Sequence, residues 1–394
     1  MNTTHTTGGP SELRIDRQRL TETAVRLIEI PSPTGQAGAV SDFLAEFLRD
    51  DGFDVERPVA GHPAAPAVAV RYSSGRPGRT LQFDGHLDTV HLPFVAPTVE
   101  DGLIRGSGAS DMKGGLAAAI EALRAIRDAN LLSAGSILLT AHDLHEAPWG
   151  DGRQLDQMIR DGYVGDAVLI PEPMHEPLAV IGRGSATWKV SIHREGPPVH
   201  EVRRPLDQPS VIAAGAELVT RLNAMNDRLS HPTDPLCGPA SVFIGQFHAG
   251  EIYNQFPQDC WLQGTRRWLP GTDRRTVESE FRAFLGELAQ QTRTKIDCDW
   301  FFIRDAFRLD QADPFVTAFQ SVYRDRSGAP LAIGGKLFVD DGNSFYSLAQ
   351  VPAITHGARG GGAHTTEEWV SIDDLIRVAE VYALTAAAYC PRPA

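Results

Sequence analysis

The segment FDGHLDTV, residues 83–90, combines an imidazole and a carboxylate at the end of an expected strand. His86 and Asp88 are two positions apart, so on a strand their side chains share one face. A carboxylate beside a metal-binding imidazole fixes the tautomer of the ring and raises its basicity. A surface histidine with a nearby charge would carry the same two residues, so this segment alone leaves both interpretations open.

The segment GSGASDMKGG, residues 106–115, brings a carboxylate to the start of a long apolar helix. Its glycines allow a tight turn and a close approach of the backbone to an ion. Asp111 would lie at the positive end of the helix dipole, where a carboxylate is favoured. It is therefore either an ordinary helix-capping residue or, if further ligands are found, a carboxylate that bridges two cations.

Two more candidate ligands follow later in the chain. Glu172 comes directly after a short apolar run and lies between two prolines, and His364 lies in the glycine-rich stretch GGGAHTTEE, residues 360–368. Taken singly, Glu172 reads as a solvated acid in a turn and His364 as a loop residue. Glu367 and Glu368 are then expected as first-turn acids of the last helix.

Strands that alternate with helices must position these side chains. Apolar spacing predicts helices over 15–28, 39–50, 112–129, 210–225, 275–292, 314–326 and 371–389, and strands over 68–72, 80–83, 136–141, 166–170, 187–193 and 352–355. The candidate ligands follow strands or glycine turns. This order predicts an α/β domain whose site lies at the carboxyl ends of its strands.

The pattern of apolar and polar residues changes near residue 184. Apolar and polar residues alternate over 187–193, as in a half-exposed strand. Further strand-like runs and helices there indicate antiparallel α+β structure. After residue 313, predicted helices and strands alternate again as in the first part of the chain. We therefore expect one α/β domain, formed by residues 1–183 and 301–394, with an α+β module inserted at residues 184–300.

Composition narrows the class of protein. The chain has 394 residues, 42% hydrophobic and 22% charged, and its net charge is −13. That charge argues against a nucleic-acid partner. The first ten residues lack the apolar core of a secretory signal, and no apolar run is long enough to span a membrane. Four scattered cysteines predict free thiols, so a soluble cytoplasmic protein is expected.

Considered together, these segments resemble the M20 family of metallopeptidases and amidohydrolases. The resemblance extends over residues 15–389, and its motifs are GHLDTV, GSGASDMKGG, PEP and GAHTTEEWV in the α/β part, with EGPPVH, YNQFP and RRWLP in the inserted module. It implies a zinc-peptidase-like catalytic domain and an inserted ferredoxin-like lid or dimerisation domain. It also implies two divalent metal ions, which nitrogen and oxygen ligands allow to be Zn, Co or Mn.

The resemblance also implies roles for single residues of the α/β part. His86 is expected to bind one metal ion, with Asp88 as the carboxylate beside it. Asp111 is expected to bridge the two ions, and Glu172 to complete the first. His364 is expected to bind the second.

In the inserted module the resemblance implies contacts with the substrate. His200 is similar to the histidine that reaches the partner subunit's site in family dimers and stabilises the oxyanion. Asn254 is similar to an amide that contacts the substrate. Arg267 is similar to the arginine that holds a substrate carboxylate, a task that suits the guanidinium fork.

The segment AHDLHEAPWG, residues 141–150, departs from the family pattern, which has a general-base glutamate followed by a metal-binding glutamate. Aligned on Gly150 without a gap, that pair falls on Leu144 and His145, which makes His145 the ligand and leaves Glu146 as the base. With one residue inserted, the pair is His145 and Glu146, and Glu146 is the ligand. In both alignments Glu146 is the acid expected to be essential.

The predicted function is metal-dependent hydrolysis of an amide-type C–N bond in a small carboxylate-bearing substrate, such as an N-acyl amino acid or a peptide. Asp143 is the fallback base or, equally, a turn-capping residue. Two alternatives stay open: hydrolysis of another C–N bond, carbamoyl or aromatic amine, at a modified metal site, and a catalytically silent homologue that binds a ligand. A homodimer or higher homo-oligomer is expected, without nucleic-acid or membrane partners.

Overall fold

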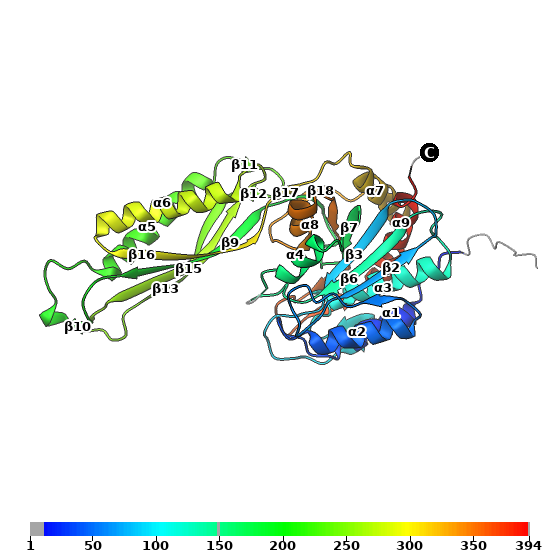
Figure 1. The fold of residues 1–394 in the computed structure, drawn as a ribbon, viewed down its shortest axis with the longest axis horizontal. Helices are drawn as coiled ribbons and strands as arrows, with labels where there is room; N and C mark the ends of the chain where they lie inside the picture. The colour runs from blue at the N-terminus through cyan, green and yellow to red at the C-terminus, as the bar shows by residue number, and fades with distance from the viewer. Residues whose placement is uncertain (1–11, 148–149, 393–394) are drawn as a thin grey trace, which may run out of the picture. The chain divides into compact units, whose positions relative to one another are not determined.

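The computed structural model describes residues 12–147 and 150–392. The chain divides into two compact units (Figure 1). Unit 1 comprises Met1–Val180, Leu309–Gly334 and Asp340–Ala394, and unit 2 comprises Ile181–Arg308 and Gly335–Val339. The unit boundaries fall within or next to β8 (Leu178–Gly182), β17 (Phe307–Arg308) and β18 (Ile333–Lys336).

A six-stranded sheet forms the centre of unit 1. Its order is β1-β2-β6-β3-β7-β19, with bounds Val55–Glu56, Val68–Ser73, Ser136–His142, Thr80–His86, Ala167–Ile170 and Ala353–Thr355. Strands β6, β3, β7 and β19 are mutually parallel, whereas β1 and β2 run antiparallel to their neighbours. The parallel strands are buried on both faces and read as near-continuous apolar runs. Their carboxyl ends therefore meet at one edge of the sheet.

Helices cover both faces of this sheet, as the side chains of β3 show. Phe83 packs on Tyr382 of α9 (Ile372–Tyr389), whereas the side chain of Asp84 faces α8 (Asp341–Ala349). Because successive side chains of a strand point to opposite faces, α9 and α8 lie on opposite sides of the sheet.

The other helices of unit 1 extend these two layers. Helix α3 (Lys113–Asp128) packs against α1 (Arg17–Ile28), α9 and strand β3. Helix α4 (Arg153–Arg160) packs on α8, α7 (Pro314–Ser327) packs on α9, and α2 (Gly38–Asp50) packs on β1 and β2. Within the described parts of the chain, no helix has both the length and the apolar character needed to cross a membrane.

A second, smaller sheet holds two loops of unit 1 together. Its order is β20-β21-β5-β4, with bounds Gly360–Gly361, Trp369–Ser371, Leu103–Arg105 and Thr98–Glu100. The pairing of β21 with β5 places the loop after β5, which contains Asp111, beside the loop between β20 and β21, which contains His364.

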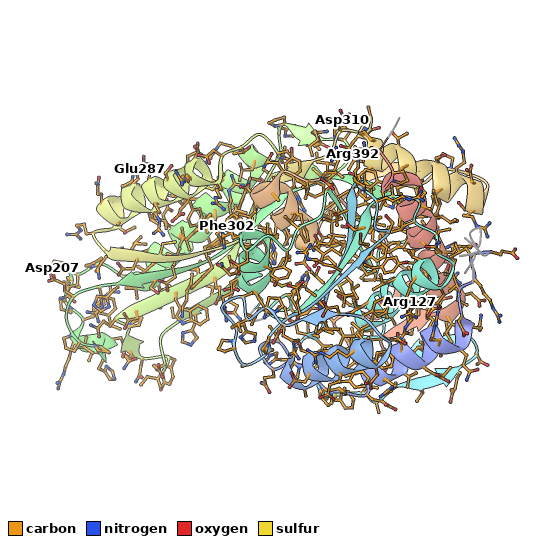
Figure 2. All side chains as sticks on the ribbon, turned by 45° about the vertical axis from the view of Figure 1, so that its right-hand side comes forward. Arg127, Asp207, Glu287, Phe302, Asp310 and Arg392 are labelled. Atoms are coloured by element: carbon orange, nitrogen blue, oxygen red, sulfur yellow. The ribbon has the colours of Figure 1, made fainter. Side chains whose placement is uncertain are left out.

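Unit 2 is an antiparallel sheet covered by two helices. The sheet order is β13-β15-β9-β16, with bounds Ser241–Ala249, Asp259–Trp268, Gly184–His193 and Lys295–Arg304. Helices α5 (Val211–Leu229) and α6 (Arg274–Thr292) pack on it around a core that includes Trp188, Leu218 and Phe281. Two short pairs complete it: β10 (Val199–His200) with β14 (Gln255–Phe256), and β11 (Thr233–Asp234) with β12 (Gly238–Pro239). Figure 2 shows Phe302 among the side chains of this sheet and Arg127 near the end of α3 in unit 1.

Strand β9 has the predicted half-buried alternation and lies between β15 and β16. The structure differs from the sequence-based expectations in two respects. Helices α4 and α8 were not predicted, because polar residues and glycine interrupt their short apolar patterns. Glu367 and Glu368 precede β21 rather than starting the last helix, which begins at Ile372.

Candidate metal centre

Five side chains expected to act together lie at the carboxyl edge of the unit 1 sheet. His86 ends β3, Glu172 follows β7 by two residues, and His145 follows the end of β6. Asp111 precedes α3, and His364 lies between β20 and β21. Parallel strands present their carboxyl ends at the same edge, which is the physical reason why these distant residues converge.

Asp111 lies between two histidines and presents a different oxygen to each. Its Oδ1 is 3.2 Å from Nε2 of His86, and its Oδ2 is 3.4 Å from Nε2 of His364. Glu172 lies on the first side, with Oε1 3.5 Å from Nε2 of His86. The arrangement therefore has two adjacent groups of donor atoms that share one carboxylate.

His145 contacts the group of His86 and Glu172, whereas Glu146 lies nearer Asp111, with one oxygen within 4.8 Å of donor atoms of His86 and Asp111. The ring of His145 stacks on that of His86 with centroids 4.0 Å apart, and its Nε2 is 3.4 Å from Oε1 of Glu172. Its Nδ1 lies 2.9 Å from Oδ1 of Asp341. The carboxylate of Glu146 instead lies 3.1 Å from Nε2 of His364. His145 thus shows the pattern of a metal-binding histidine, one ring nitrogen toward the donor group and the other on a carboxylate.

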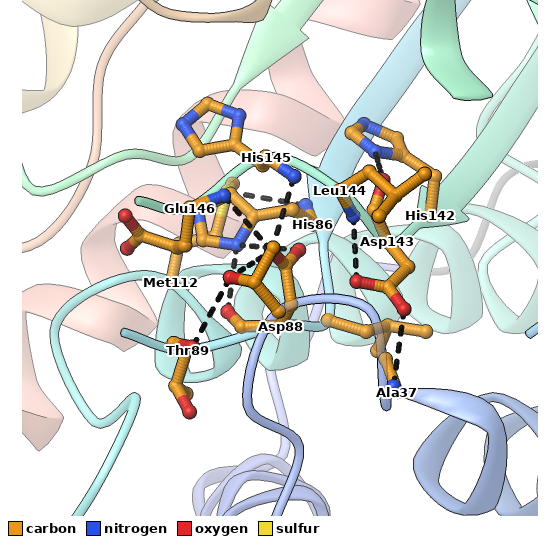
Figure 3. Close-up of polar contacts among 12 residues, drawn as sticks. Ala37, His86, Asp88, Thr89, Met112, His142, Asp143, Leu144, His145 and Glu146 are labelled. Atoms are coloured by element: carbon orange, nitrogen blue, oxygen red, sulfur yellow. Dashed lines mark hydrogen bonds and ion pairs between the residues drawn. The ribbon is translucent and has the colours of Figure 1, made fainter. Parts of the chain in front are cut away.

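Asp88 holds the segment that carries these two residues. Its Oδ2 accepts hydrogen bonds from the backbone N–H groups of His145 and Glu146, at 3.0 and 2.8 Å, and from the hydroxyl of Thr34 at 2.9 Å (Figure 3). His86 is oriented by the backbone carbonyl of Asp88, 2.9 Å from Nδ1, while the nearer carboxylate oxygen is 3.6 Å away. The chain turns into this position at Leu144, whose φ is +69°.

The glycine loop before α3 is held by a buried carboxylate. Glu368 accepts hydrogen bonds from the backbone N–H groups of Gly108, Ser110 and Asp111, at 2.7, 2.8 and 2.7 Å. Burial raises the pKa of Glu368 to about 7. Glu368 therefore fixes the backbone from which Asp111 projects.

Burial and close charges shift the pKa values across the cluster. Burial raises the pKa of Glu172 to about 8, and the Asp111 carboxylate adds to that shift. Burial alone would lower the pKa of His86, but contacts with Asp111 and Glu172 raise it well above its usual value. Contacts with Asp111 and Glu146 raise the pKa of His364 to about 10. The buried carboxylates thus require positive charge beside them, which imidazolium groups or metal ions can supply.

The donor atoms have the spacing of ligands around a small cation. A tetrahedral ion with bonds of about 2.0–2.2 Å places its ligand atoms about 3.3–3.6 Å apart. The contacts of His86 with Asp111 and Glu172, of His145 with Glu172 and of His364 with Asp111 lie between 3.2 and 3.5 Å. The donor atoms of His86, His145 and Glu172 all lie within 4.8 Å of one another. This set of nitrogen and oxygen donors fits the expected ions.

Other predicted site residues lie outside this cluster. Asp143 accepts from the backbone N–H groups of Gly35 and Ala37, at 2.9 and 3.1 Å, so it holds a neighbouring loop. In unit 2, the side-chain nitrogen of Asn254 is 3.2 Å from Nε2 of His200, and the His200 side chain is half exposed. Arg267 lies near the end of β15, where burial lowers the pKa of its guanidinium.

Sequence reasoning missed three charged residues beside the cluster: Asp84, His142 and Asp341. Two signals could have found them. Asp84 is two positions before His86 on the same strand, and His142 pairs with His86 in the neighbouring parallel strand. Asp341 starts α8, a helix that the sequence pattern did not predict.

Fold and site together define a hydrolase with an α/β catalytic unit, an inserted α+β unit and a histidine–carboxylate centre. The family model for peptidase family M20/M25/M40 matches residues 83–388. The chain belongs to this family, and the predicted fold class and enzyme class are confirmed. It is a metallohydrolase that acts on amide-type C–N bonds.

Relatives and solved structures agree with this assignment. A succinyl-diaminopimelate desuccinylase of Methylorubrum extorquens is 28% identical over 393 residues, which cover 93% of this chain and 97% of the relative. The aminopeptidase PepT of Bacillus cereus has a TM-score of 0.78 at 18% identity, covering 95% of this chain and 99% of that one. A dinuclear metal-binding M20 peptidase of Bacillus subtilis has a TM-score of 0.67 at 15% identity, covering 94% and 97%.

Proposed function

We propose that this chain hydrolyses the amide bond of a small carboxylate-bearing N-acyl amino acid or peptide at a centre built for two divalent metal ions. The observation that carries this proposal is the position of Asp111, which turns one oxygen to His86 and the other to His364. A shared carboxylate between two groups of nitrogen and oxygen donors is the arrangement that a two-metal site requires.

The contacts support the following ligand assignment. His86, His145 and Glu172 would hold one ion, His364 the other, and Asp111 both; Zn is the proposed metal, with Co or Mn as substitutes. When bound, such a pair of ions lowers the pKa of a water molecule and polarises a carbonyl group. Asp341 supports this assignment because it holds Nδ1 of His145 and leaves Nε2 facing Glu172.

Glu146 is the proposed proton acceptor. With His145 in a ligand position, Glu146 is the remaining carboxylate that faces the centre, and only 4% of its surface is exposed. A carboxylate in this position takes the proton of the attacking water and returns it to the leaving amine. Asp88 acts as a positioning residue, because it orients both His86 and the segment that carries Glu146.

His200, Asn254 and Arg267 all belong to unit 2. We propose for them the roles that the resemblance implies: His200 reaches the site of the partner subunit and stabilises the oxyanion, Asn254 contacts the substrate, and Arg267 holds a substrate carboxylate. The desuccinylase relative acts, by its name, on an N-acylated diamino acid, and the two solved structures described above are named as peptidases. These names support a substrate with an amide bond close to a carboxylate.

A homodimer or higher homo-oligomer, built through unit 2, is part of the proposal. Strand β13 is an edge of the unit 2 sheet, and its Phe243 and Phe247 are 63% and 45% exposed. Exposed aromatic residues on an edge strand favour contact with another chain. Light scattering of the full chain should give the mass of a dimer or a higher oligomer, and a monomer at all concentrations would contradict the proposal.

The four free cysteines support the proposed location in a reducing compartment, the cytoplasm.

The experiment combines a substrate panel with one conservative variant. Zn-loaded protein is assayed on N-succinyl, N-acetyl and N-carbamoyl amino acids and on dipeptides, with and without a chelator. Glu146→Gln should retain the bound metal and lower kcat by roughly 10²–10⁴-fold, because the amide cannot accept a proton. Chelation should abolish turnover in the wild type, and returning Zn should restore it.

Each other outcome corrects a specific part of the proposal. Loss of one metal ion in Glu146→Gln would make Glu146 a ligand rather than the base. Turnover of the N-carbamoyl substrates alone would favour the alternative C–N bond. Folded protein that binds no metal and hydrolyses none of the substrates would support the alternative hypothesis, a catalytically silent homologue that binds a ligand.

A further inference from the structure

A second group of possible metal ligands is buried beside the proposed centre. Asp84 lies in β3, His142 ends β6 and Asp341 begins α8, and each of the three is at most 1% exposed. One possible ligand atom of each residue lies within 4.8 Å of those of the other two. None of these residues belongs to the ligand set proposed above.

The distances within the group are those between ligands of one ion. Nε2 of His142 is 3.2 Å from Oδ2 of Asp341 and 3.5 Å from Oδ2 of Asp84. A tetrahedral ion with bonds of about 2.0–2.2 Å gives ligand separations of about 3.3–3.6 Å. The group therefore has the same spacing as the proposed catalytic donors.

Two of these atoms are buried without a hydrogen-bond partner, Oδ2 of Asp84 and Nε2 of His142. The other atoms of the same side chains are engaged. Oδ1 of Asp84 accepts from the hydroxyl of Thr140, and Nδ1 of His142 lies 3.3 Å from the carbonyl oxygen of Asp143. A carbonyl at Nδ1 favours the tautomer that leaves Nε2 as a ligand. Buried polar atoms without partners are costly, and a bound ion would satisfy both.

Charge points in the same direction. One divalent cation would balance the two carboxylates in their ionised form, which burial disfavours for Asp84 by raising its pKa, while the imidazole stays neutral. A proton on His142 would balance only one of them within the group. Two carboxylate oxygens and one imidazole nitrogen are ligands that Zn²⁺ and Mn²⁺ accept.

We propose that Asp84, His142 and Asp341 bind a third divalent cation, distinct from the two at the proposed catalytic centre. This ion would join the carboxyl ends of β3 and β6 to the start of α8. It would also fix Asp341, whose other oxygen holds Nδ1 of His145 at 2.9 Å. The third ion is thus a structural element that positions a ligand of the catalytic centre.

The test is the metal content of the full chain. Bound metal is removed with a chelator, and the protein is dialysed against Zn²⁺ or Co²⁺. Unbound ions are then removed, and the metal content is measured by inductively coupled plasma mass spectrometry. The wild type should hold about three ions per chain, and His142→Gln and Asp84→Asn should each hold about one fewer. His62→Gln, a histidine control outside the group, should keep the wild-type content. The double variant Glu172→Gln/His364→Ala, which disrupts the catalytic centre, should keep about one.

The double variant separates this proposal from the proposed function and does not depend on the folding of His142→Gln. Two ions in the wild type and none in the double variant would overturn the third site and leave the catalytic centre intact. One ion in both proteins, lost in Asp84→Asn, would support the third site and overturn the two-ion centre. A Co²⁺ absorption band that persists in the double variant and disappears in Asp84→Asn would locate the ion in this group.

Discussion

At the scale of single residues, this centre contains two aspartates that each make two different contacts. Asp111 faces His86 with one carboxylate oxygen and His364 with the other. Asp88 orients His86 through its backbone carbonyl and holds the segment of His145 and Glu146 through its carboxylate. In each case the second contact involves residues distant in the sequence, so the residue type alone does not reveal it.

Replacing Asp88 by asparagine should impair turnover more than folding. The amide oxygen can take the place of Oδ2 and keep its three hydrogen bonds, but the NH₂ group then replaces Oδ1, which faces Nδ1 of His86 at 3.6 Å, and the negative charge is lost. We expect Asp88→Asn to lower kcat/KM by roughly 10–100-fold, as losses of groups that orient metal ligands do. Thr34→Val, which removes only the hydroxyl donor, should have a smaller effect. Equal kcat/KM in Asp88→Asn and the wild type would contradict the positioning role.

At the scale of elements, the glycine loop before α3 has its conformation set from another part of the chain. Three of its backbone N–H groups donate hydrogen bonds to the carboxylate of Glu368, which precedes β21. The antiparallel pairing of β21 with β5 brings Glu368 to the loop. The loop geometry is therefore a property of the small sheet rather than of the glycines alone.

Glu368→Gln should destabilise unit 1. A glutamine has a single accepting oxygen, so it leaves at least one buried N–H without its present acceptor. We expect the free energy of unfolding to fall by about 1–3 kcal/mol, measured by urea denaturation. Glu367→Gln is the matched control, because the neighbouring Glu367 is exposed and should unfold like the wild type. An unchanged midpoint in Glu368→Gln would show that the loop does not need this carboxylate.

At the scale of the whole molecule, His356 links the sheet of unit 1 to its helices. It follows β19, its ring packs edge-on against Phe319 and Tyr323 of α7, and its carbonyl accepts from the hydroxyl of Tyr382 in α9. The ring is 1% exposed, and neither of its nitrogens has a hydrogen-bond partner. Burial lowers the pKa of His356 to about 3.

This depressed pKa predicts that acid weakens the folded state. Below pH 6.5 the unfolded chain binds a proton at His356 that the folded chain does not bind until about pH 3. Stability is therefore fully present above pH 6.5 and falls with pH between these values, by up to about 1.4 kcal/mol per pH unit. His356→Leu should remove this part of the slope, measured by urea unfolding of chelated protein at pH 7 and pH 5. The same slope in both proteins would contradict the prediction.

The amino-acid sequence by itself was enough to predict most of the elements and to mark candidate ligands. The spacing of apolar residues predicted strands β3 and β6 and helices such as α3 and α9 to within a few residues. This works because the apolar face of a helix, or a fully buried strand, is visible in the sequence of that segment alone. Glycines, prolines and the order of the motifs along the chain were enough to mark His86, Asp111 and His364 as candidate ligands.

Only the tertiary structure shows which contacts the ambiguous residues make. The alignment of residues 141–150 left His145 and Glu146 interchangeable, and the contacts of His145 with Asp341 and of Glu146 with His364 support the roles proposed above. Asp341 begins a helix that the apolar pattern did not predict. Asp84 and His142 are seen to be neighbours only because β3 pairs with β6. The physical reason is that ligand geometry depends on register between distant strands, whereas helix and strand patterns depend on near neighbours.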